Sequence, residues 1–275
     1  MLEGDGRMEN NLIDAIRTNW VSLLVSLAVI GFLYVLARKR VGFGYRILIA
    51  LGLGILAGVF FNSFHFQANS VSTIGTIYVN LIKMIVIPLV VVLVITSITS
   101  VSNLGHLRKI GVKTISLFLL TTGIAALIGL LVALAIAPGT GIQQAPPQDY
   151  KPRDIPTFSQ VILDLTPVNP ISDMANGKVV PVLLFSIFVA IAIVHVGSKK
   201  PETVQPVKQV VDSFAQVMHQ VTKYIIRLTP YGVYALIAAM ASRYGFETLA
   251  PLLKLVAATY AALLIHFVAT FGGLV

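Results

Sequence analysis

The stretch TISLFLLTTGIAALIGLLVALAIAPGTGI, residues 114–142, contains no charged residue, no amide side chain and no histidine. A helix needs about 20 apolar residues to cross a hydrocarbon core about 30 Å thick. Backbone that spans lipid must satisfy its own hydrogen bonds, and this stretch is too long and too uniformly apolar for a barrel strand. It therefore predicts a transmembrane helix.

The rest of the chain has the same character. Its 275 residues are 56% apolar and only 11% charged, with a mean hydropathy of +0.88, whereas soluble domains carry about a quarter charged residues. This composition excludes a soluble globular protein, and it excludes disorder, which requires low hydrophobicity and high charge. We predict an all-α polytopic membrane protein with about seven transmembrane helices. The apolar segments cover residues 20–37, 44–62, 75–101, 112–137, 179–196, 209–241 and 248–275. Because 209–241 is long and its first half is amphipathic, we expect it to tilt or to lie along the interface.

The net charge of +9 indicates an orientation in the membrane rather than a nucleic-acid partner. Three connections, 38–46, 103–113 and 197–208, together carry ten lysines and arginines and one glutamate. The positive-inside rule places them in the cytoplasm, and therefore places the N-terminus and the proline-rich stretch 138–178 outside. The leader before the first apolar segment is acidic, so we expect that segment to be a retained helix rather than a signal peptide. Within the outer stretch, residues 156–166 predict a short surface helix.

The sequence offers no template for catalysis. It has no cysteine, which excludes disulfides, thiolate nucleophiles and cysteine–zinc sites, and it contains no G-x-S-x-G, H-E-x-x-H or Walker loop. His195, His219 and His266 do not share the paired spacing of a metal site. We therefore expect no catalytic residue, no metal and no cofactor. A membrane enzyme or haem protein is the less favoured alternative.

Some bases occur inside or at the edges of apolar segments: Lys83, Lys223, Arg227 and Lys254. An intramembrane charge is costly and by default suggests function, but long basic side chains near a helix end also extend to the headgroups. No acid is available within a span to carry a proton or a cation. Asp164 and Asp173 belong to the outer stretch, and Asp212 stands at an inner interface.

Small and hydroxylated residues recur where helices can approach closely. The run from Gly54 to Gly58 fits G-x-x-x-G, which favours close helix packing but is common by chance in apolar segments. Thr121 and Thr122 lie inside the uncharged stretch. Their hydroxyls either bond back to carbonyls of their own helix or act as oxygen ligands for a hard cation. The residues alone favour the first interpretation.

Four stretches occur in a characteristic order. They are YVNLIKMIVIPL (78–89), LGHLRKIGVKTISLFLLTTGIAALIGLLVALAIAPG (104–139), LDLTPVNPISDMANGKVVPVLLFSIFVAIAI (163–193) and RLTPYGVYALIA (227–238). Together they resemble the dicarboxylate/amino acid:cation symporter family, the glutamate transporter homologues, from about residue 43 to the end of the chain. The chain is most similar to the L-cystine symporter branch in its extra N-terminal span and in the sequences RLTPYGV and 258–268. The run ANGKVVP is more similar to the glutamate/aspartate branch.

The resemblance implies the elevator fold of that family and a homotrimer whose subunits work independently. Residues 1–42 would form an additional helix and a cytoplasmic basic loop, and residues 43–275 the N-terminal portion of the symporter domain. The spans at 112–137 and 248–275 would begin the mobile transport domain. The remaining spans would build the scaffold and its trimer contacts: 44–62, 75–101, 179–196 and 209–241.

The resemblance also bears on binding residues. One cation site of the family uses a tyrosine followed by a threonine and a serine, and the matching residues here are Phe118, Thr121 and Thr122. Both later hydroxyls are kept but the tyrosine hydroxyl is lost, which leaves sodium and proton coupling both open. The family's re-entrant hairpins and last helices hold the substrate residues. These residues are expected downstream of Val275.

The function that the resemblance implies is secondary active transport across the plasma membrane, the inner membrane of a bacterium. A sodium or proton gradient would drive symport of an amino acid, L-cystine above all, or of a related dicarboxylate. The expected partners are this substrate, membrane lipid and further copies of the chain, and no nucleic acid. The alternative is a truncated, transport-incompetent scaffold fragment of such a symporter.

Overall fold

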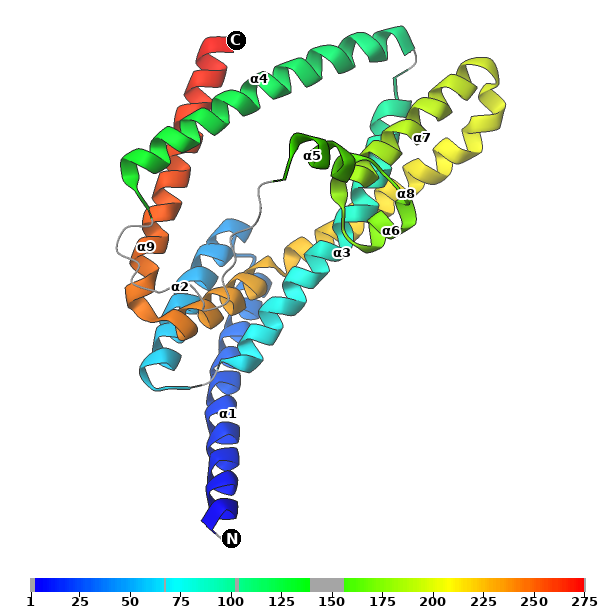
Figure 1. Ribbon diagram of the computed structural model, residues 1–275. Coiled ribbons are helices and arrows are strands. Elements are labelled where there is room, and N and C mark those ends of the chain that lie inside the picture. The colour runs from blue at the N-terminus through cyan, green and yellow to red at the C-terminus, as the bar shows by residue number, and fades with distance from the viewer. Residues whose placement is uncertain (1–2, 67, 102–103, 139–155, 275) are drawn as a thin grey trace. The chain divides into compact units, whose positions relative to one another are not determined.

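The structure is a computed structural model that describes residues 3–66, 68–101, 104–138 and 156–274 (Figure 1). Within these residues every regular element is an α-helix, as the apolar segments predict. In chain order they are α1 (Glu3–Arg38), α2 (Phe43–Ser63), α3 (Asn69–Thr99), α4 (Leu104–Ile136), α5 (Phe158–Leu165), α6 (Pro170–Ala175), α7 (Val179–Lys199), α8 (Pro201–Arg227) and α9 (Thr229–Leu274).

Most of these helices are long and apolar enough to cross a membrane. Within the described residues six stretches qualify alone, and α8 together with Thr229–Gly245 of α9 makes a seventh, broken span with a bend of 48°. The six are Trp20–Arg38, Phe43–Ser63, Asn69–Thr99, Ile110–Ile136, Val179–Lys199 and Leu253–Thr270. The prediction of a polytopic helical membrane protein is confirmed.

The predicted segment 209–241 is not one tilted helix but two. The first, α8, begins at Pro201, before the predicted start at residue 209, and ends at Arg227. The second, α9, follows after the bend. Pro230 has no N–H to donate to the carbonyl of Ile226, four residues earlier. The Thr229 hydroxyl donates to that carbonyl instead, at 2.6 Å, so the bend leaves no orphan acceptor there.

The predicted gap between the last two apolar segments is confirmed as a break inside α9. Gly245 has φ +69° and ψ 179°, outside the helical region. A positive φ is strained for residues with a Cβ and free for glycine. The chain therefore changes direction at the residue best suited to do so.

The basic stretches 103–113 and 197–208, which the sequence indicates only as connections between spans, are mostly helical in the described residues. Helix α4 already begins at Leu104, and only Lys200 separates α7 from α8. Lysine and arginine are good helix formers, so the transmembrane helices extend beyond their apolar parts. The short surface helix predicted at 156–166 is confirmed as α5.

The chain divides into two compact units, each described here by itself. Unit 1 comprises Met1–Ile82, Val132–Ile142 and Tyr224–Ala261. Unit 2 comprises the remaining ranges, Lys83–Leu131, Gln143–Lys223 and Ala262–Val275. This division does not follow chain order, and the predicted boundary near residue 42 stays a prediction.

Close helix packing holds unit 1 together. A Cβ placed on Gly54 would lie 3.0 Å from the Tyr234 carbonyl, and one on Gly58 would lie 2.5 Å from both the Ala238 carbonyl and the Ala241 Cβ. The G-x-x-x-G run therefore lets α2 lie directly against the first part of α9. This contact is part of a core whose buried members are Leu33, Ala50, Ala57, Phe61, Val71, Tyr234, Ala235 and Ala238.

Buried polar groups of unit 1 are paired between helices. The Tyr234 hydroxyl on α9 donates to Ser26 Oγ on α1 at 3.0 Å, and both side chains are buried. Asn62 Nδ2 on α2 donates to the Ser242 carbonyl at 2.8 Å. Such bonds contribute about 0.6 kcal/mol each between transmembrane helices. They also fix which faces meet.

Unit 2 is built on α3, α7 and α8. One cluster of buried side chains comes from all three helices: Ile95, Ala190, Ile193 and Val204. Lys208 Nζ donates to the Thr99 carbonyl at 3.2 Å. This carbonyl ends α3, where unpaired acceptors and the negative end of the helix dipole favour a cation.

We expect Gly58→Ala to destabilise unit 1, because the added methyl group overlaps backbone of α9 that cannot move aside. The expected cost is about 1–3 kcal/mol, measured as a lower midpoint of thermal unfolding in detergent. Gly52→Ala is the matched control on the same helix, because its Cβ would meet nothing within 4 Å. Equal midpoints for the two variants would show that the α2–α9 contact does not carry stability.

Candidate functional site

The predicted cation-site threonines lie on the apolar helix α4. Thr121 Oγ1 donates to the Phe118 carbonyl at 3.1 Å, the back-bonding within a helix that the residues alone favour. A hydroxyl keeps acceptor lone pairs when it donates, so this bond does not use the ligand capacity of Thr121. Thr122 is exposed, and so is Phe118. No carboxylate or histidine cluster that could hold a metal occurs in the residues described.

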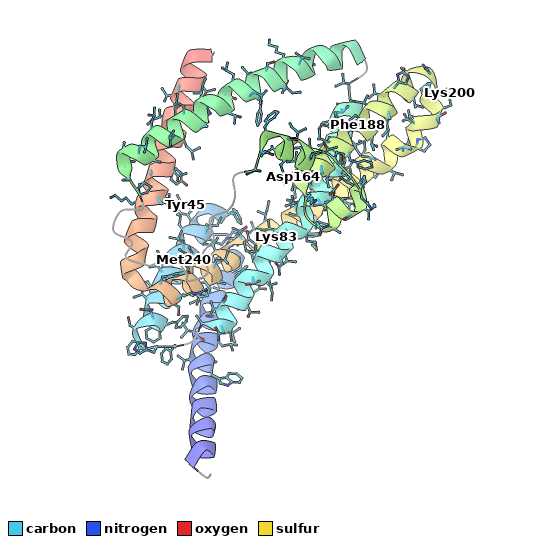
Figure 2. All side chains as sticks on the ribbon, in the orientation of Figure 1. Tyr45, Lys83, Asp164, Phe188, Lys200 and Met240 are labelled. Carbon is cyan, nitrogen blue, oxygen red and sulfur yellow. The ribbon has the colours of Figure 1, made fainter. Side chains whose placement is uncertain are left out.

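The surroundings of α4 differ from those of the other long helices. None of the residues in its apolar stretch Ile110–Ile136 is buried, and Leu253–Thr270 of α9 buries only Ala258. By contrast, a third of the apolar stretch Val179–Lys199 is buried. Figure 2 shows the described side chains of α4 projecting from its ribbon. This apolar surface requires lipid or protein to cover it.

A polar face of α8 meets α3 in unit 2. Thr96 Oγ1 donates to Asp212 Oδ1 at 3.0 Å. The two residues line a cavity of about 640 Å³ together with other polar residues of α8: Gln216, His219, Gln220 and Lys223. Sequence reasoning treated Asp212, His219 and Lys223 as separate features. Their spacing by seven and four residues, about two turns and one turn of a helix, was the signal that they share one helix face.

Two of the stretches that carried the family resemblance meet in unit 2. Lys83 and Pro88 of α3 line a cavity of about 980 Å³ together with Asn176 and Gly177 after α6 and with Phe214 of α8. Gly177 has φ +68°, which supports the tight turn. Lys83 is exposed and faces this otherwise mainly apolar groove.

Unit 2 contains a buried acid, Asp173, which sequence reasoning placed in the outer stretch. Asp173 on α6 is 5% exposed, and its Oδ1 lies 3.7 Å from Lys178 Nζ. The other carboxylate oxygen, Oδ2, is buried and accepts no hydrogen bond from any described residue. The Lys178 amide closes the same turn by donating to the Asp173 carbonyl at 2.9 Å. Asp173 thus organises the run Asp-Met-Ala-Asn-Gly-Lys.

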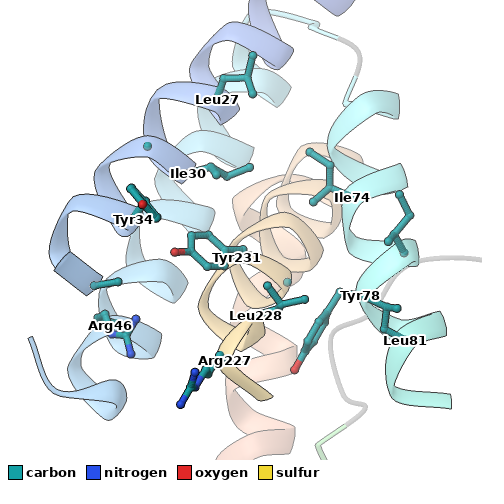
Figure 3. A pocket seen from close by; sticks show the side chains of 14 residues that line it. Leu27, Ile30, Tyr34, Arg46, Ile74, Tyr78, Leu81, Arg227, Leu228 and Tyr231 are labelled. Atoms are coloured by element: carbon teal, nitrogen blue, oxygen red, sulfur yellow. The ribbon is translucent and has the colours of Figure 1, made fainter. Parts of the chain in front are cut away.

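The remaining predicted residues are scattered. His266 is half-buried, and its Nδ1 lies 3.2 Å from Thr270 Oγ1 on its own helix. His195 and Lys254 are exposed, and the described structure does not bring either to one of the cavities above. Arg227 lines a cavity of unit 1, whose geometry is shown in Figure 3.

The unit 1 cavity has a volume of about 930 Å³. Its walls come from α1, α2, α3 and the junction of α8 with α9. Tyr78 on α3 donates to Thr229 Oγ1 at 2.9 Å and so fixes one wall. Gly232 lies where a side chain would meet the Tyr78 ring, so glycine is needed there for the close approach.

Comparison with known proteins gives a consistent result. The family model described as the sodium:dicarboxylate symporter family matches residues 43–275. A proton/sodium-glutamate symport protein of Bacillus caldotenax is 34% identical over 247 residues, which are 86% of this chain and 57% of that relative. The same values hold for the proton/sodium-glutamate symport protein of Geobacillus stearothermophilus. The L-cystine uptake protein TcyP of Bacillus anthracis is 31% identical over 269 residues, 90% of this chain and 58% of the relative.

Proposed function

The chain belongs to the sodium:dicarboxylate symporter family, as its motifs predict, and on this basis we propose that it serves cation-coupled symport of an amino acid or dicarboxylate. The observation that carries the proposal is the family match over residues 43–275, which include α2 to α9. The family is one of transporters rather than enzymes. The apolar helices and the bacterial relatives support a multi-pass protein of a bacterial plasma membrane.

We propose L-cystine as the substrate and sodium or protons as the coupling cation. The chain spans 57% of the length of one relative named for glutamate and 58% of one named for L-cystine. Support for L-cystine comes from residues 227–233 and 258–268, whose sequences are most similar to the L-cystine branch. The sequence of residues 175–181 instead supports glutamate or aspartate. The comparisons do not favour the alternative of a transport-incompetent fragment over a symporter.

The proposed mechanism is an elevator within a homotrimer, in which a mobile domain carries substrate past a fixed scaffold. Two observations support the division into bodies. Helices α2, α3 and α7, assigned to the scaffold, bury part of their apolar surface in the chain. Helix α4 and the last part of α9, assigned to the mobile domain, bury almost none. No bond is made or broken in this process, and the gradient alone drives accumulation.

Uptake into proteoliposomes tests the proposed function. We expect the purified protein to accumulate radiolabelled L-cystine more strongly than aspartate when a sodium or proton gradient points inward. Dissipating the gradient with an ionophore is the matched control and should abolish accumulation. Stronger aspartate uptake would reassign the substrate. No uptake of either under both gradients would favour the fragment alternative.

We propose Thr121 and Thr122 as ligands of the coupling cation. Support comes from the lone pairs that the Thr121 hydroxyl keeps despite its bond to Phe118. Removing an oxygen that binds a charged group costs about 1.5–3 kcal/mol. Thr121→Ala should therefore raise the cation concentration for half-maximal uptake roughly ten-fold or more, with trimers intact by cross-linking. Thr114→Ala, two turns earlier on the same face, is the control. An unchanged cation dependence in Thr121→Ala would remove this site.

We propose that the N-terminus and α5 lie outside the cell, on the support of the basic connections. The chain has no cysteine, so single introduced thiols report topology directly. Phe158→Cys, exposed on α5, should react with an impermeant maleimide in intact cells. Lys39→Cys and Lys200→Cys should react only after permeabilisation. The opposite pattern would invert the proposed orientation.

A further inference from the structure

The unit 1 cavity, here called the arginine cavity, has a charged end and an apolar end. Figure 3 shows Arg46 and Arg227 on one side, and Leu27 and Ile74 on the other. Tyr34, which lines the cavity, accepts a hydrogen bond from Arg38 Nε at 2.9 Å. The complete lining is Leu27, Ile30, Gly31, Tyr34, Ala37, Arg46, Ile74, Ile77, Tyr78, Leu81, Arg227, Leu228, Tyr231 and Gly232.

The positive charge of the arginine cavity is not compensated by its walls. No carboxylate occurs among the residues that line it. Arg46 packs over the Phe43 ring at 5.6 Å, but its Nε is buried and donates to no acceptor in the described part of the chain. A donor of a charged group that has neither water nor an acceptor is unfavourable. The site therefore favours a bound anion.

The shape of the cavity restricts what that anion is. Its walls away from the arginines are aliphatic and aromatic, and its volume of about 930 Å³ is that of a ligand pocket. An amino-acid substrate carries an ammonium group, for which the cavity provides no carboxylate. A small free anion leaves the apolar end empty. An anionic headgroup with an attached acyl chain fits both ends.

We infer that the arginine cavity binds an anionic phospholipid, with its phosphate on Arg46 and Arg227 and an acyl chain along α1 and α3. Guanidinium groups bind phosphate oxygens through paired hydrogen bonds, which a lysine cannot reproduce. Arg46 ends the basic stretch 38–46, which the proposed orientation places at the cytoplasmic leaflet, where anionic lipids are enriched. Arg227 is thus a lipid ligand rather than a base that merely extends to the headgroups.

The chain's single tryptophan makes a fluorescence test practical. Trp20→Phe with Ile77→Trp places one tryptophan on the lining, at an exposed position of α3. We reconstitute this protein in phosphatidylcholine bilayers with a fixed fraction of brominated phosphatidylglycerol or brominated phosphatidylcholine. Brominated phosphatidylglycerol should quench the tryptophan more strongly than brominated phosphatidylcholine does. Excess unbrominated phosphatidylglycerol should reverse this quenching. Equal quenching by the two lipids would overturn the proposal.

Charge variants locate the binding. Arg46→Gln and Arg227→Gln should each weaken the preference for phosphatidylglycerol roughly five-fold, as expected for loss of one basic contact. Lys39→Gln removes a charge from the same basic stretch without touching the cavity, so its preference should be unchanged. Circular dichroism checks that the variants keep their helices. An equal loss in Lys39→Gln would show general surface attraction and overturn the proposal. The proposal would also be overturned if inorganic phosphate reversed the quenching in the reporter protein that keeps both arginines, because a free anion would then be the ligand.

Discussion

Lipid provides no hydrogen bonds to a spanning backbone, and every other feature of this chain follows from that constraint. Helices are the direct response, and the described residues contain no other regular element. The constraint also explains the details at the bend between α8 and α9. Proline removes a donor there, and the Thr229 hydroxyl satisfies the carbonyl of Ile226 that is left over. The bend is tolerated because this acceptor is occupied.

The same constraint changes what holds helices to one another. Apolar side chains gain little by leaving lipid for a neighbouring helix, so packing depends on small residues and on polar pairs. Unit 1 uses both: Gly54 and Gly58 admit the backbone of α9, and the Tyr234–Ser26 bond fixes α1 against it. Unit 2 relies more on polar pairs, with Thr96 bonded to Asp212 across α3 and α8. Close packing therefore marks the helices that stay together.

Sequence reasoning located the spans, the break before 248 and the short helix α5, because each leaves a local signal in composition or periodicity. It missed the bend at Arg227 and the helical nature of the basic connections. It also gave Gly54 and Gly58 no partner, and it did not bring Arg46 near Arg227. The glycine contacts and the meeting of Arg46 with Arg227 involve residues about 180 positions apart, and a single helix pattern shows a face without showing what covers it. The bend and the helical connections, by contrast, have local causes in Pro230 and in the helix propensity of lysine and arginine. The proposed role of Thr121 and Thr122 as cation ligands was one of two interpretations that the residues left open, and the resemblance is what favoured it over bonding within the helix.

The distribution of burial connects this architecture to transport. A body that slides needs a surface without interlocking small residues or interhelical bonds, since each such contact would have to be broken at every cycle. Helix α4 fits this requirement: its only described side-chain hydrogen bond, from Thr121, stays within the helix, and its apolar stretch is bare. The helices α1, α2 and the first part of α9 are joined by glycine contacts and buried hydroxyl bonds. Under the proposed elevator mechanism, the distinction between a moving and a fixed helix in this chain would therefore rest on interhelical contacts rather than on hydrophobicity.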